Sequence, residues 1–467
     1  MTAETIARSP RRTGELQLLG VALVVALAAY AAVSLAHDDR IDGSLVKYGA
    51  GLAALFAVAH LAVRRLAPAA DPVLLPLAAA LNGLGLAMVR RLDLAALDTA
   101  RQRGRPDPAA LAPRQLLWTA VGVVVFVAVL AVVRDHRTLD RYRYTAMALG
   151  LTLLLLPALP VIGTEINGAR IWIRVGSLQF QPAEIAKLCL ITFFASYLVA
   201  KREVLSLASR RVAGLNVPRA RDLGPVVLAW LASLLVLVRE KDLGSSLLFF
   251  GLFIVMLYIA TERTSWLLIG LALFSVGTFV AFVAFGHVRQ RIDTWLDPFA
   301  DAAGSGFQLT QALFGMATGG IFGSGLGRGR PDAVPEAETD FIFASIGEEL
   351  GLIGVVAVLA VYALIVARGV RVGLGVRDDF GKLFAGGLAF AVGLQVFVVA
   401  GGVTRLIPLT GITLPFVSYG GSSLVANYAL IALLLRISDA GRGADPTVPP
   451  PVPREELTGE LTQVVRR

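Results

Sequence analysis

Residues 18–36 read Leu-Leu-Gly-Val-Ala-Leu-Val-Val-Ala-Leu-Ala-Ala-Tyr-Ala-Ala-Val-Ser-Leu-Ala, without one charged side chain. A helix needs roughly 20 such residues to cross about 30 Å of hydrocarbon. The run is too long for the core of a signal peptide, and no convincing cleavage site accompanies it. We therefore expect it to be a retained membrane helix.

The rest of the 467-residue chain has the same apolar character. Hydrophobic residues make up 56% of it, and the mean hydropathy is +0.71, beyond the apolar share of about half that is usual in soluble domains. Only helices or closed barrels satisfy backbone polar groups in lipid, and these apolar runs are continuous rather than alternating. The sequence therefore predicts an all-α polytopic membrane protein of about twelve helices. The expected helices cover 18–36, 44–63, 72–89, 114–133, 142–162, 182–200, 223–238, 243–261, 264–285, 341–368, 382–402 and 414–436.

Lys and Arg residues in the short loops predict the orientation in the membrane. The N-terminal segment 1–17 carries Arg8, Arg11 and Arg12, and it lies on the same side as three other basic segments if it is cytoplasmic. Both ends are then cytoplasmic, and a large polar loop faces outward. The exception is 90–113, which places five arginines on the outer side. The other three basic segments are 134–143, 201–222 and 369–382, and the outward loop is 286–340.

The transmembrane domain is expected to cover residues 18–440. The tail 441–467 is rich in proline, so it cannot build a core, and we expect a disordered cytoplasmic tether. The net charge of +9 would suggest nucleic acid in a soluble protein, but membrane topology explains it better, so no nucleic-acid partner is expected. Cys189 is the single cysteine and the four histidines are scattered, so no pattern predicts a metal site.

Two short segments interrupt the apolar pattern in the first half of the chain. The first contains Arg170, Trp172 and Arg174 and continues into Phe-Gln-Pro-Ala-Glu at 180–184, where the proline suits the first turn of a helix and the glutamate its positive end. An interfacial Trp anchor explains this segment equally well. The second, at 239–246, reads Arg-Glu-Lys-Asp-Leu-Gly-Ser-Ser, and a plain hairpin with an aspartate helix cap is the favoured interpretation.

The outward loop 286–340 carries both charge and glycine. Arg289 and Arg291 could engage phosphate groups bidentately, and the glycines between 304 and 329 let a backbone approach a ligand closely. A flexible solvated loop is the alternative. Apolar residues such as Phe307 and Phe314 alternate with the glycines, which favours ordered re-entrant pieces at the membrane surface.

The loop ends in acidic residues, of which Asp340 is the most informative. It lies where the loop meets the next helix, so it could cap that helix. The same position would favour an ionised carboxylate, which could act as a general base. Two turns further on, Glu348 and Glu349 enter the apolar run, where charge is costly and indicates function.

The fourth segment, 401–423, contains paired glycines and two prolines where a spanning helix is expected. A broken helix at membrane depth is tolerated where it is buried in protein or lines a cavity. A kinked packing joint is the simpler explanation, but Arg405 favours a groove that contacts an anion. Candidate polar contacts in this segment are Ser418, Tyr419, Ser422 and Ser423.

These four segments, in this order, resemble the SEDS family of RodA and FtsW. The resemblance covers about residues 142–437. Its most specific motifs are Pro-Glu-Ala-Glu-Thr-Asp-Phe-Ile-Phe at 335–343, with Glu-Glu-Leu-Gly at 348–351, and Leu-Pro-Phe-Val-Ser-Tyr-Gly-Gly-Ser-Ser at 414–423. Family members usually have ten helices, so two extra helices precede the core here. The chain also has Lys241 where a proline is usual, Val399 where an asparagine is frequent and Arg405 where a glycine is common.

The resemblance implies a peptidoglycan glycosyltransferase that polymerises lipid II on the outer face of the cytoplasmic membrane. It also implies a class B penicillin-binding protein as partner within a cell-wall elongation or division complex. The family's essential acid falls on Asp340 and its loop tryptophan on Trp172. Asp340 would then take the proton from the 4-hydroxyl of the acceptor GlcNAc as it attacks the donor anomeric carbon.

The leaving group of that reaction is a polyprenyl pyrophosphate, whose charge needs stabilisation. No cofactor is certain, although a divalent cation such as Mg²⁺ or Mn²⁺ could assist. Glu336 and Glu338 could tune Asp340 or hold such an ion. The cationic candidates are Arg170, Arg174, Arg289, Arg291 and Arg405.

Three other interpretations stay open at this point. A lipid II flippase would also be polytopic, but it predicts polar residues at the midplane, whereas here they gather at one face. A scaffold that recruits proteins through its tail is a further alternative. A division polymerase of the FtsW type is the third, although the stretch 402–408 and the extra N-terminal helices look more like actinobacterial RodA.

Overall fold

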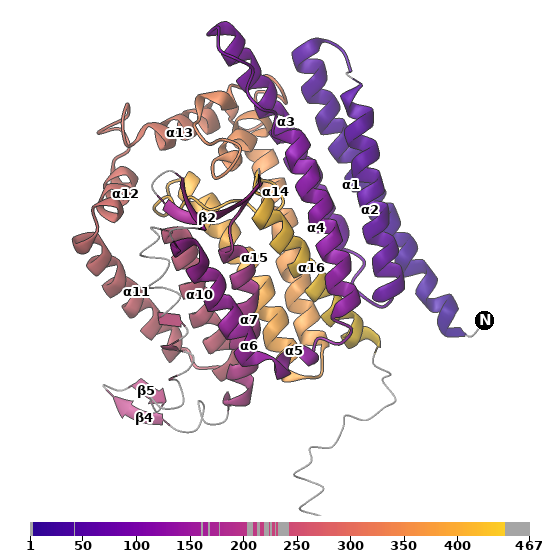
Figure 1. The fold of residues 1–467 in the computed structure, drawn as a ribbon, viewed down its shortest axis with the longest axis vertical. Helices are drawn as coiled ribbons and strands as arrows, with labels where there is room; N and C mark the ends of the chain where they lie inside the picture. Colours follow the sequence, from indigo (N-terminus) through magenta and orange to yellow (C-terminus); the bar gives the residue numbers. More distant parts are fainter. Residues whose placement is uncertain are drawn as a thin grey trace, which may run out of the picture.

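The protein is a bundle of helices that run between two ends of the molecule (Figure 1). The computed structural model describes residues 3–41, 43–159, 162–166, 169–176, 178–202, 209–212, 215–218, 224, 227, 228, 230, 231 and 242–443. The helices are α1 (Ala3–Asp38), α2 (Ser44–Leu66), α3 (Leu74–Gln102), α4 (Ala112–Val132), α5 (Thr138–Arg141), α6 (Arg143–Leu155), η1 (Leu156–Ala158), α7 (Ala183–Ala200), α10 (Leu243–Thr261), α11 (Ser265–Ala284), α12 (Gly286–Leu296), α13 (Phe307–Gly319), η2 (Pro331–Ala333), α14 (Ile342–Gly375), α15 (Asp379–Val403) and α16 (Gly421–Gly443).

The helical membrane fold predicted from the apolar runs is confirmed. Nine helices in the described ranges are long and apolar enough to cross a membrane, and α3 and the shorter α6 run along the same bundle (Figure 1). Most of the helix expected over 223–238 lies outside the described residues, as does most of the expected tail. α16 is central, because every residue from 421 to 438 is buried, and it packs on α4, α14 and α7.

Several expected helix boundaries are wrong. α1 begins at Ala3 instead of 18, and α14 and α16 end at Gly375 and Gly443 instead of 368 and 436. α6 and η1 end at Ala158 instead of 162, and the following segment forms a sheet. α16 starts at Gly421 instead of 414, because Pro415, Ser418 and Tyr419 bond to other segments. α3 continues to Gln102 instead of ending at 89, because protein partners satisfy its polar residues: the Asp93 carboxylate, for example, accepts the amides of Leu111 and Ala112, both at 2.8 Å.

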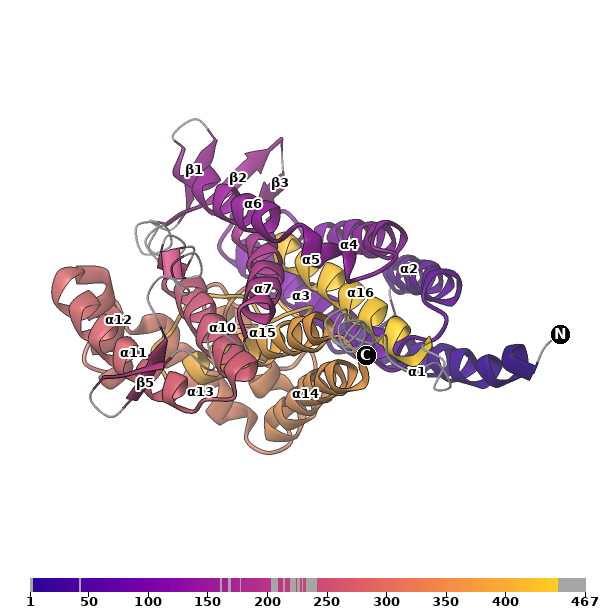
Figure 2. The ribbon, with the colours of Figure 1, turned by 90° about the horizontal axis from the view of Figure 1, so that it is seen from below.

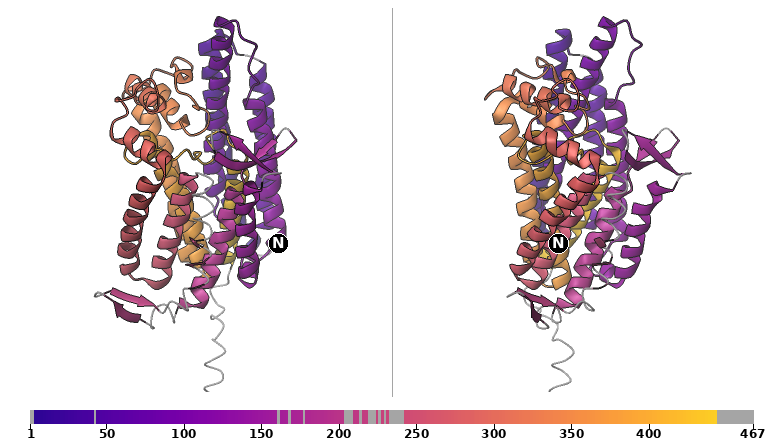
Figure 3. Two further views of the ribbon diagram at one scale, coloured as in Figure 1. Left: turned by 60° about the vertical axis from the view of Figure 1, so that its left-hand side comes forward. Right: turned by 90° about the vertical axis from the view of Figure 1, so that its left-hand side faces the viewer.

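The bundle has two different ends. α1 begins and α16 ends toward one of them, whereas α12, α13 and β2 lie toward the other (Figure 1). The basic segments 134–143 and 369–382 meet at the first end, where the His136 ring nitrogen Nε2 lies 3.0 Å from a carboxylate oxygen of Asp378. The hairpin of β4 (Ser209–Val212) and β5 (Leu215–Pro218) is also there, far from α12 and α13 (Figure 3).

One of the five arginines in the exceptional stretch 90–113 has a structural explanation. Arg91 is buried, and its guanidinium donates to the Glu349 carboxylate and to the Gly329 carbonyl, both at 2.7 Å. Glu349 is fully buried and also accepts the Gly327 amide at 3.0 Å. This arginine and the deep glutamate therefore join α3 to α14 and to the glycine-rich loop, so the charge of Arg91 does not act as a topological signal.

α14 is broken at Gly351, which has a φ of +64° and a ψ of −168°. The segment 320–325 lies against this break, so close that a Cβ at Gly351 would be 2.3 Å from the Gly323 amide nitrogen. The backbone groups freed by the break are satisfied by that segment, as lipid-depth backbone requires. The bonds are Ser324 N to Glu348 O (2.9 Å), Gly325 N to Glu349 O (3.0 Å), Leu352 N to Gly320 O (2.9 Å) and Ile353 N to Ile321 O (3.2 Å).

Removing one partner of the buried Arg91–Glu349 pair should strongly destabilise the fold. We expect Glu349→Ala to lower the free energy of unfolding by about 3–5 kcal/mol, because Arg91 would remain buried without its carboxylate. Thermal unfolding of the purified protein in detergent measures this. Arg101→Ala, at the exposed end of the same helix, is the matched control and should change stability by less than about 1 kcal/mol. Equal melting temperatures for the two variants would contradict the account.

Candidate functional site

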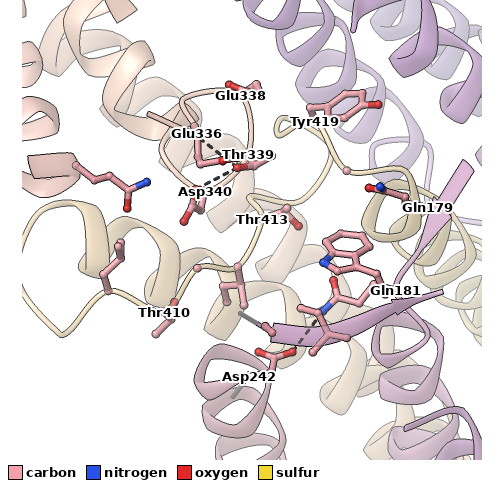
Figure 4. Close-up of a pocket in the computed structure, with 18 of the residues that line it drawn as sticks. Gln179, Gln181, Asp242, Glu336, Glu338, Thr339, Asp340, Thr410, Thr413 and Tyr419 are labelled. Atoms are coloured by element: carbon pink, nitrogen blue, oxygen red, sulfur yellow. Dashed lines mark hydrogen bonds between the residues drawn. The ribbon is translucent and has the colours of Figure 1, made fainter. Parts of the chain in front are cut away.

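A cavity of about 810 Å³, lined by many charged and polar side chains, has α12 and the start of α13 in its wall; Figure 1 shows these two helices toward one end of the bundle. Its walls come from eight parts of the chain: the starts of α4, α7, α10 and α13, the small sheet, α12, the turn at 336–340 and the segment 409–421. Figure 4 shows the labelled polar side chains around this space, with Asp340 from the turn before α14 and Asp242 from the start of α10. All four segments singled out in the sequence thus meet in one site.

Asp340 lies half-buried in the cavity wall. It does not cap α14, whose N-cap is Phe341; its carboxylate accepts a hydrogen bond from the Thr339 hydroxyl at 3.1 Å. Burial raises the pKa of Asp340 to about 6, against the lowering effect of local hydrogen bonds and of Arg291. Burial therefore outweighs the expected lowering of this pKa by a helix end, but a pKa near 6 leaves the carboxylate mostly ionised at neutral pH and suits a general base.

Arg291 is the cation next to this acid. Its Nη1 donates to the Leu409 carbonyl at 3.0 Å, which ties α12 to the segment after α15. A Cβ at Gly411 would lie 3.7 Å from Asp340 Oδ2 and 4.0 Å from Arg291 Nη2, so the carboxylate and the guanidinium flank the same glycine. Burial lowers the pKa of Arg291, while Asp242 and Asp340 raise it.

Asp242 is a second acid in the cavity wall. It caps α10 as expected, since its carboxylate accepts the Ser245 amide at 2.9 Å and the Ser245 hydroxyl at 2.6 Å. It also accepts from the Gln181 side chain at 3.3 Å. Burial raises the pKa of Asp242, opposed by the two Ser245 hydrogen bonds and by the charge of Arg291. The favoured interpretation as a cap is thus confirmed, but the cap is also part of the site.

A polar chain extends from the cavity into the bundle. Glu184 lines the cavity, and its carboxylate accepts from Lys187 Nζ at 2.8 Å. The same Nζ donates to the Gln395 side-chain carbonyl at 2.8 Å, and the Gln395 amide donates to the Thr413 carbonyl at 2.9 Å. The chain therefore anchors the broken segment to α7 and α15, and it satisfies every charge that it buries.

Trp172 reaches the cavity from a strand, although its segment was expected to be a loop. The strands β1 (Gly163–Ile166), β2 (Ala169–Val175) and β3 (Leu178–Phe180) form an antiparallel sheet in which Trp172 pairs with Thr164. The sheet projects beside α6 (Figure 2). Trp172 and Gln179 line the cavity. Arg170 instead lies 3.8 Å from Glu165, and it and Arg174 are exposed outside the cavity.

The broken segment between α15 and α16 is held against the acid-bearing turn. The Tyr419 amide donates to the Glu338 carbonyl at 2.7 Å, and the Ser418 hydroxyl donates to the Thr339 carbonyl. Tyr419 lines the cavity. Ser418 also accepts the Leu414 amide at 2.8 Å, so it organises the turn and lies outside the cavity lining.

Four other residues expected to contact substrate have structural partners instead. The Arg405 guanidinium donates to the Trp295 carbonyl at 2.8 Å and to the Leu296 carbonyl, so it covers the C-terminal end of α12 and does not face the cavity. Ser422 accepts the Gln181 amide at 2.7 Å. Ser423 accepts from Asn427 at 3.2 Å, and Arg289 stands over the Phe282 ring at 5.4 Å.

The cavity also contains residues that the sequence did not single out. Arg114 and Trp118, on the first two turns of α4, line it together with Thr410 and Thr413. Arg114 lies at the edge of an expected helix, a position typical of an ordinary interfacial cation. Its position in the cavity wall follows only from the close packing of α4 on α16. That packing is so tight that a Cβ at Gly421 would be 2.1 Å from the Trp118 ring.

The carboxylates of the cavity do not form a ready-made metal site. No group of three or more His, Cys, Asp or Glu side chains is close enough to hold a metal ion within the described ranges. Mg²⁺ is commonly held by one or two carboxylates together with substrate phosphates. The residues present therefore fit a divalent cation only when a phosphorylated substrate completes its coordination.

These features define a polytopic membrane protein with an acid and an arginine in a polar cavity at one end. A model of the cell cycle protein family of FtsW, RodA and SpoVE matches residues 72–442. The chain belongs to this family. α1 and α2 precede the matched region, which agrees with the expectation of two extra N-terminal helices.

Individual relatives narrow the comparison. The chain is 50% identical over 458 residues to peptidoglycan glycosyltransferase RodA of Mycobacterium tuberculosis, which covers 98% of this chain and 96% of that protein. It is 37% identical over 339 residues to stage V sporulation protein E of Bacillus subtilis, covering 72% and 89%. A solved chain of a peptidoglycan synthase complex that coordinates polymerization and crosslinking is 31% identical, with a TM-score of 0.63 over 81% of this chain and 99% of that one. The rod shape determining protein RodA of Thermus thermophilus is 30% identical, with a TM-score of 0.55 and the same coverage.

Proposed function

We propose that this protein is a peptidoglycan glycosyltransferase that polymerises lipid II into glycan strands for cell elongation. The observation that carries the proposal is Asp340, a carboxylate with a pKa of about 6 in a cavity of about 810 Å³ that also holds an arginine. The RodA relative, at 50% identity over nearly the whole chain, supports the same activity. The substrate is a lipid, which suits a cavity built among membrane helices.

The reaction needs a base near the acceptor. The 4-hydroxyl of the acceptor GlcNAc would donate a hydrogen bond to Asp340, which takes its proton as the oxygen attacks the donor anomeric carbon. The new bond joins O4 to C1, while the bond from C1 to the pyrophosphate oxygen breaks. Thr339 donates to the Asp340 carboxylate and so holds its orientation for this transfer.

The leaving pyrophosphate needs positive charge. Arg291 lies beside Asp340, and Arg114 enters from α4. The α16 helix begins at Gly421 in the cavity wall, so its free amides and its dipole favour an anion there. Among the candidate arginines from the sequence, only Arg291 reaches the cavity. We therefore assign the leaving group to Arg291, Arg114 and this helix end.

The site would face the extracytoplasmic side of the bacterial plasma membrane. Support comes from the basic segments at the opposite end of the bundle, since Lys and Arg concentrate in cytoplasmic loops. The partner would be a class B penicillin-binding protein that cross-links the new strands. The similar chain of the peptidoglycan synthase complex, which coordinates polymerization and crosslinking, supports this assignment.

A lipid II flippase is the alternative from another class. It would need a polar path through the membrane midplane, whereas the large polar cavity lies at one end of the bundle. An FtsW-type division polymerase would use the same chemistry, and depletion followed by microscopy of cell shape distinguishes it from an elongation enzyme. Translocation of lipid II by vesicles without any polymerisation would favour the flippase.

Removing the proposed base should abolish most polymerisation. We expect Asp340→Asn to lower the rate of glycan formation by roughly 10²- to 10⁴-fold, since this is the usual contribution of a general base. The measurement is polymerisation of purified lipid II by the protein together with its penicillin-binding partner. Asp293→Asn, an exposed acid on α12, is the control and should retain wild-type rates. Wild-type activity of Asp340→Asn at equal thermal stability would refute the assignment.

The rate should depend on pH through the same carboxylate. Only the ionised form can accept a proton, and the folded-state pKa of Asp340 is about 6. Activity should therefore rise about tenfold per pH unit below pH 6 and level off above it. A pH profile of initial rates tests this, with thermal unfolding measured at each pH as the control. A rate that stays constant from pH 5 to pH 8 would contradict the role of Asp340.

A divalent cation would assist by sharing the charge of the pyrophosphate. Two candidate carboxylates near Asp340 line the cavity: Glu338, two residues before it, and Glu336, four residues before it. We expect EDTA to lower the rate and Mg²⁺ or Mn²⁺ to restore it. Full activity after exhaustive chelation would instead leave the two arginines and the α16 end as the stabilising groups.

A further inference from the structure

A second cavity of about 410 Å³ lies next to the first. One wall is the projecting end of α3 (Figure 1) with the segment 103–108, and the other is the segment 332–338. At the rim, the Thr99 hydroxyl donates to the Asp332 carboxylate at 3.2 Å. Its volume falls in the range of pockets that bind small ligands, roughly 300–1,000 Å³.

The two cavities share one wall. Glu336 and Glu338 line both of them, and Asp340 is only two residues further along. This turn is fixed, because the Glu336 carbonyl accepts the Thr339 amide at 3.1 Å and the Glu338 carbonyl accepts the Tyr419 amide at 2.7 Å. A group that occupies the second cavity is therefore separated from the reacting acid by a single turn of backbone.

The charges of the second cavity are divided between its walls. Arg103 and Arg105 stand on the α3 side, where within the described structure neither forms an ion pair, in contrast to Arg101, whose Nε is 3.9 Å from Asp107. Asp332, Glu336 and Glu338 form the facing wall. Such a cavity suits a ligand with at least one free carboxylate, which arginine binds in a bidentate manner, and a free amine.

We infer that the second cavity binds the stem peptide of the donor substrate. This inference rests on the proposed function. In the disaccharide-peptide unit, the sugar with the reacting anomeric carbon carries the peptide, whereas the acceptor GlcNAc carries none. The donor peptide must therefore leave the main cavity close to Asp340, and its C-terminal carboxylate and diamino-acid amine match the two walls. Arg103 and Arg105 would thus determine which donors bind.

The test varies the peptide on the donor alone. A lipid II whose GlcNAc 4-hydroxyl is blocked reacts only as donor, so it can be offered with a full pentapeptide or without a peptide while the acceptor stays unchanged. For the pentapeptide donor, we expect the charge-reversed R103E/R105E protein to show a KM raised roughly five- to tenfold at unchanged kcat. For the peptide-free donor, variant and wild type should have equal KM values.

R101E is the matched control, since Arg101 is exposed on the same turn and outside both cavities, and it should behave as wild type with both donors. Equal use of the two donors by wild type and by R103E/R105E would overturn the inference while leaving the proposed function intact. An effect confined to the peptide of the acceptor would overturn the donor assignment. Failure of the wild type to polymerise any lipid II would instead refute the proposed function, and the inference with it.

Discussion

The break in α14 at Gly351 is the constraint on which the site depends. A helix at membrane depth cannot leave backbone groups unpaired, because each costs several kcal/mol in lipid. The segment 320–325 satisfies the groups that the break exposes, and it can approach only because Gly323 and Gly351 lack side chains. The glycine-rich loop is therefore fastened to the helix that follows Asp340, and the position of the acid is fixed as a result.

Buried charge strengthens the same junction. Arg91 and Glu349 connect α3 to α14, while the Glu348 carboxylate accepts the Arg330 amide at 2.6 Å. These glutamates, expected to be functional because intramembrane acids are costly, hold the loop. Glu336 in the cavity wall, and Arg405 and Phe416 in the broken segment, adopt positive φ values of 56°, 63° and 65°. Such strained backbone, about 1–3 kcal/mol per residue, persists because the surrounding hydrogen bonds determine it.

The sequence predicted most of the helices because lipid imposes long apolar runs. It also singled out Asp340, which stands at a junction within a specific motif and which the structure places in the cavity wall. The sequence-based predictions failed where a polar side chain has a protein partner in place of lipid or water. The polar half of α3 is helical because Arg91 pairs with Glu349, far along the chain, and because Asp93 accepts the Leu111 amide from the connection to α4. From the sequence, Arg405 is expected to face the cavity and Arg114 is not identified. Both errors have the same origin, since only tertiary packing decides which arginine faces the cavity.

The central claim is that Asp340 contacts the attacking hydroxyl in the cavity formed by α4, α12, the sheet and the broken segment. The most direct measurement is a structure of the protein with an acceptor and an unreactive donor analogue. The account predicts the acceptor 4-hydroxyl at about 2.6–3.2 Å from the Asp340 carboxylate, with the pyrophosphate toward Arg291, Arg114 and the start of α16. Sugars bound elsewhere, with Asp340 beyond hydrogen-bonding reach of both substrates, would contradict it.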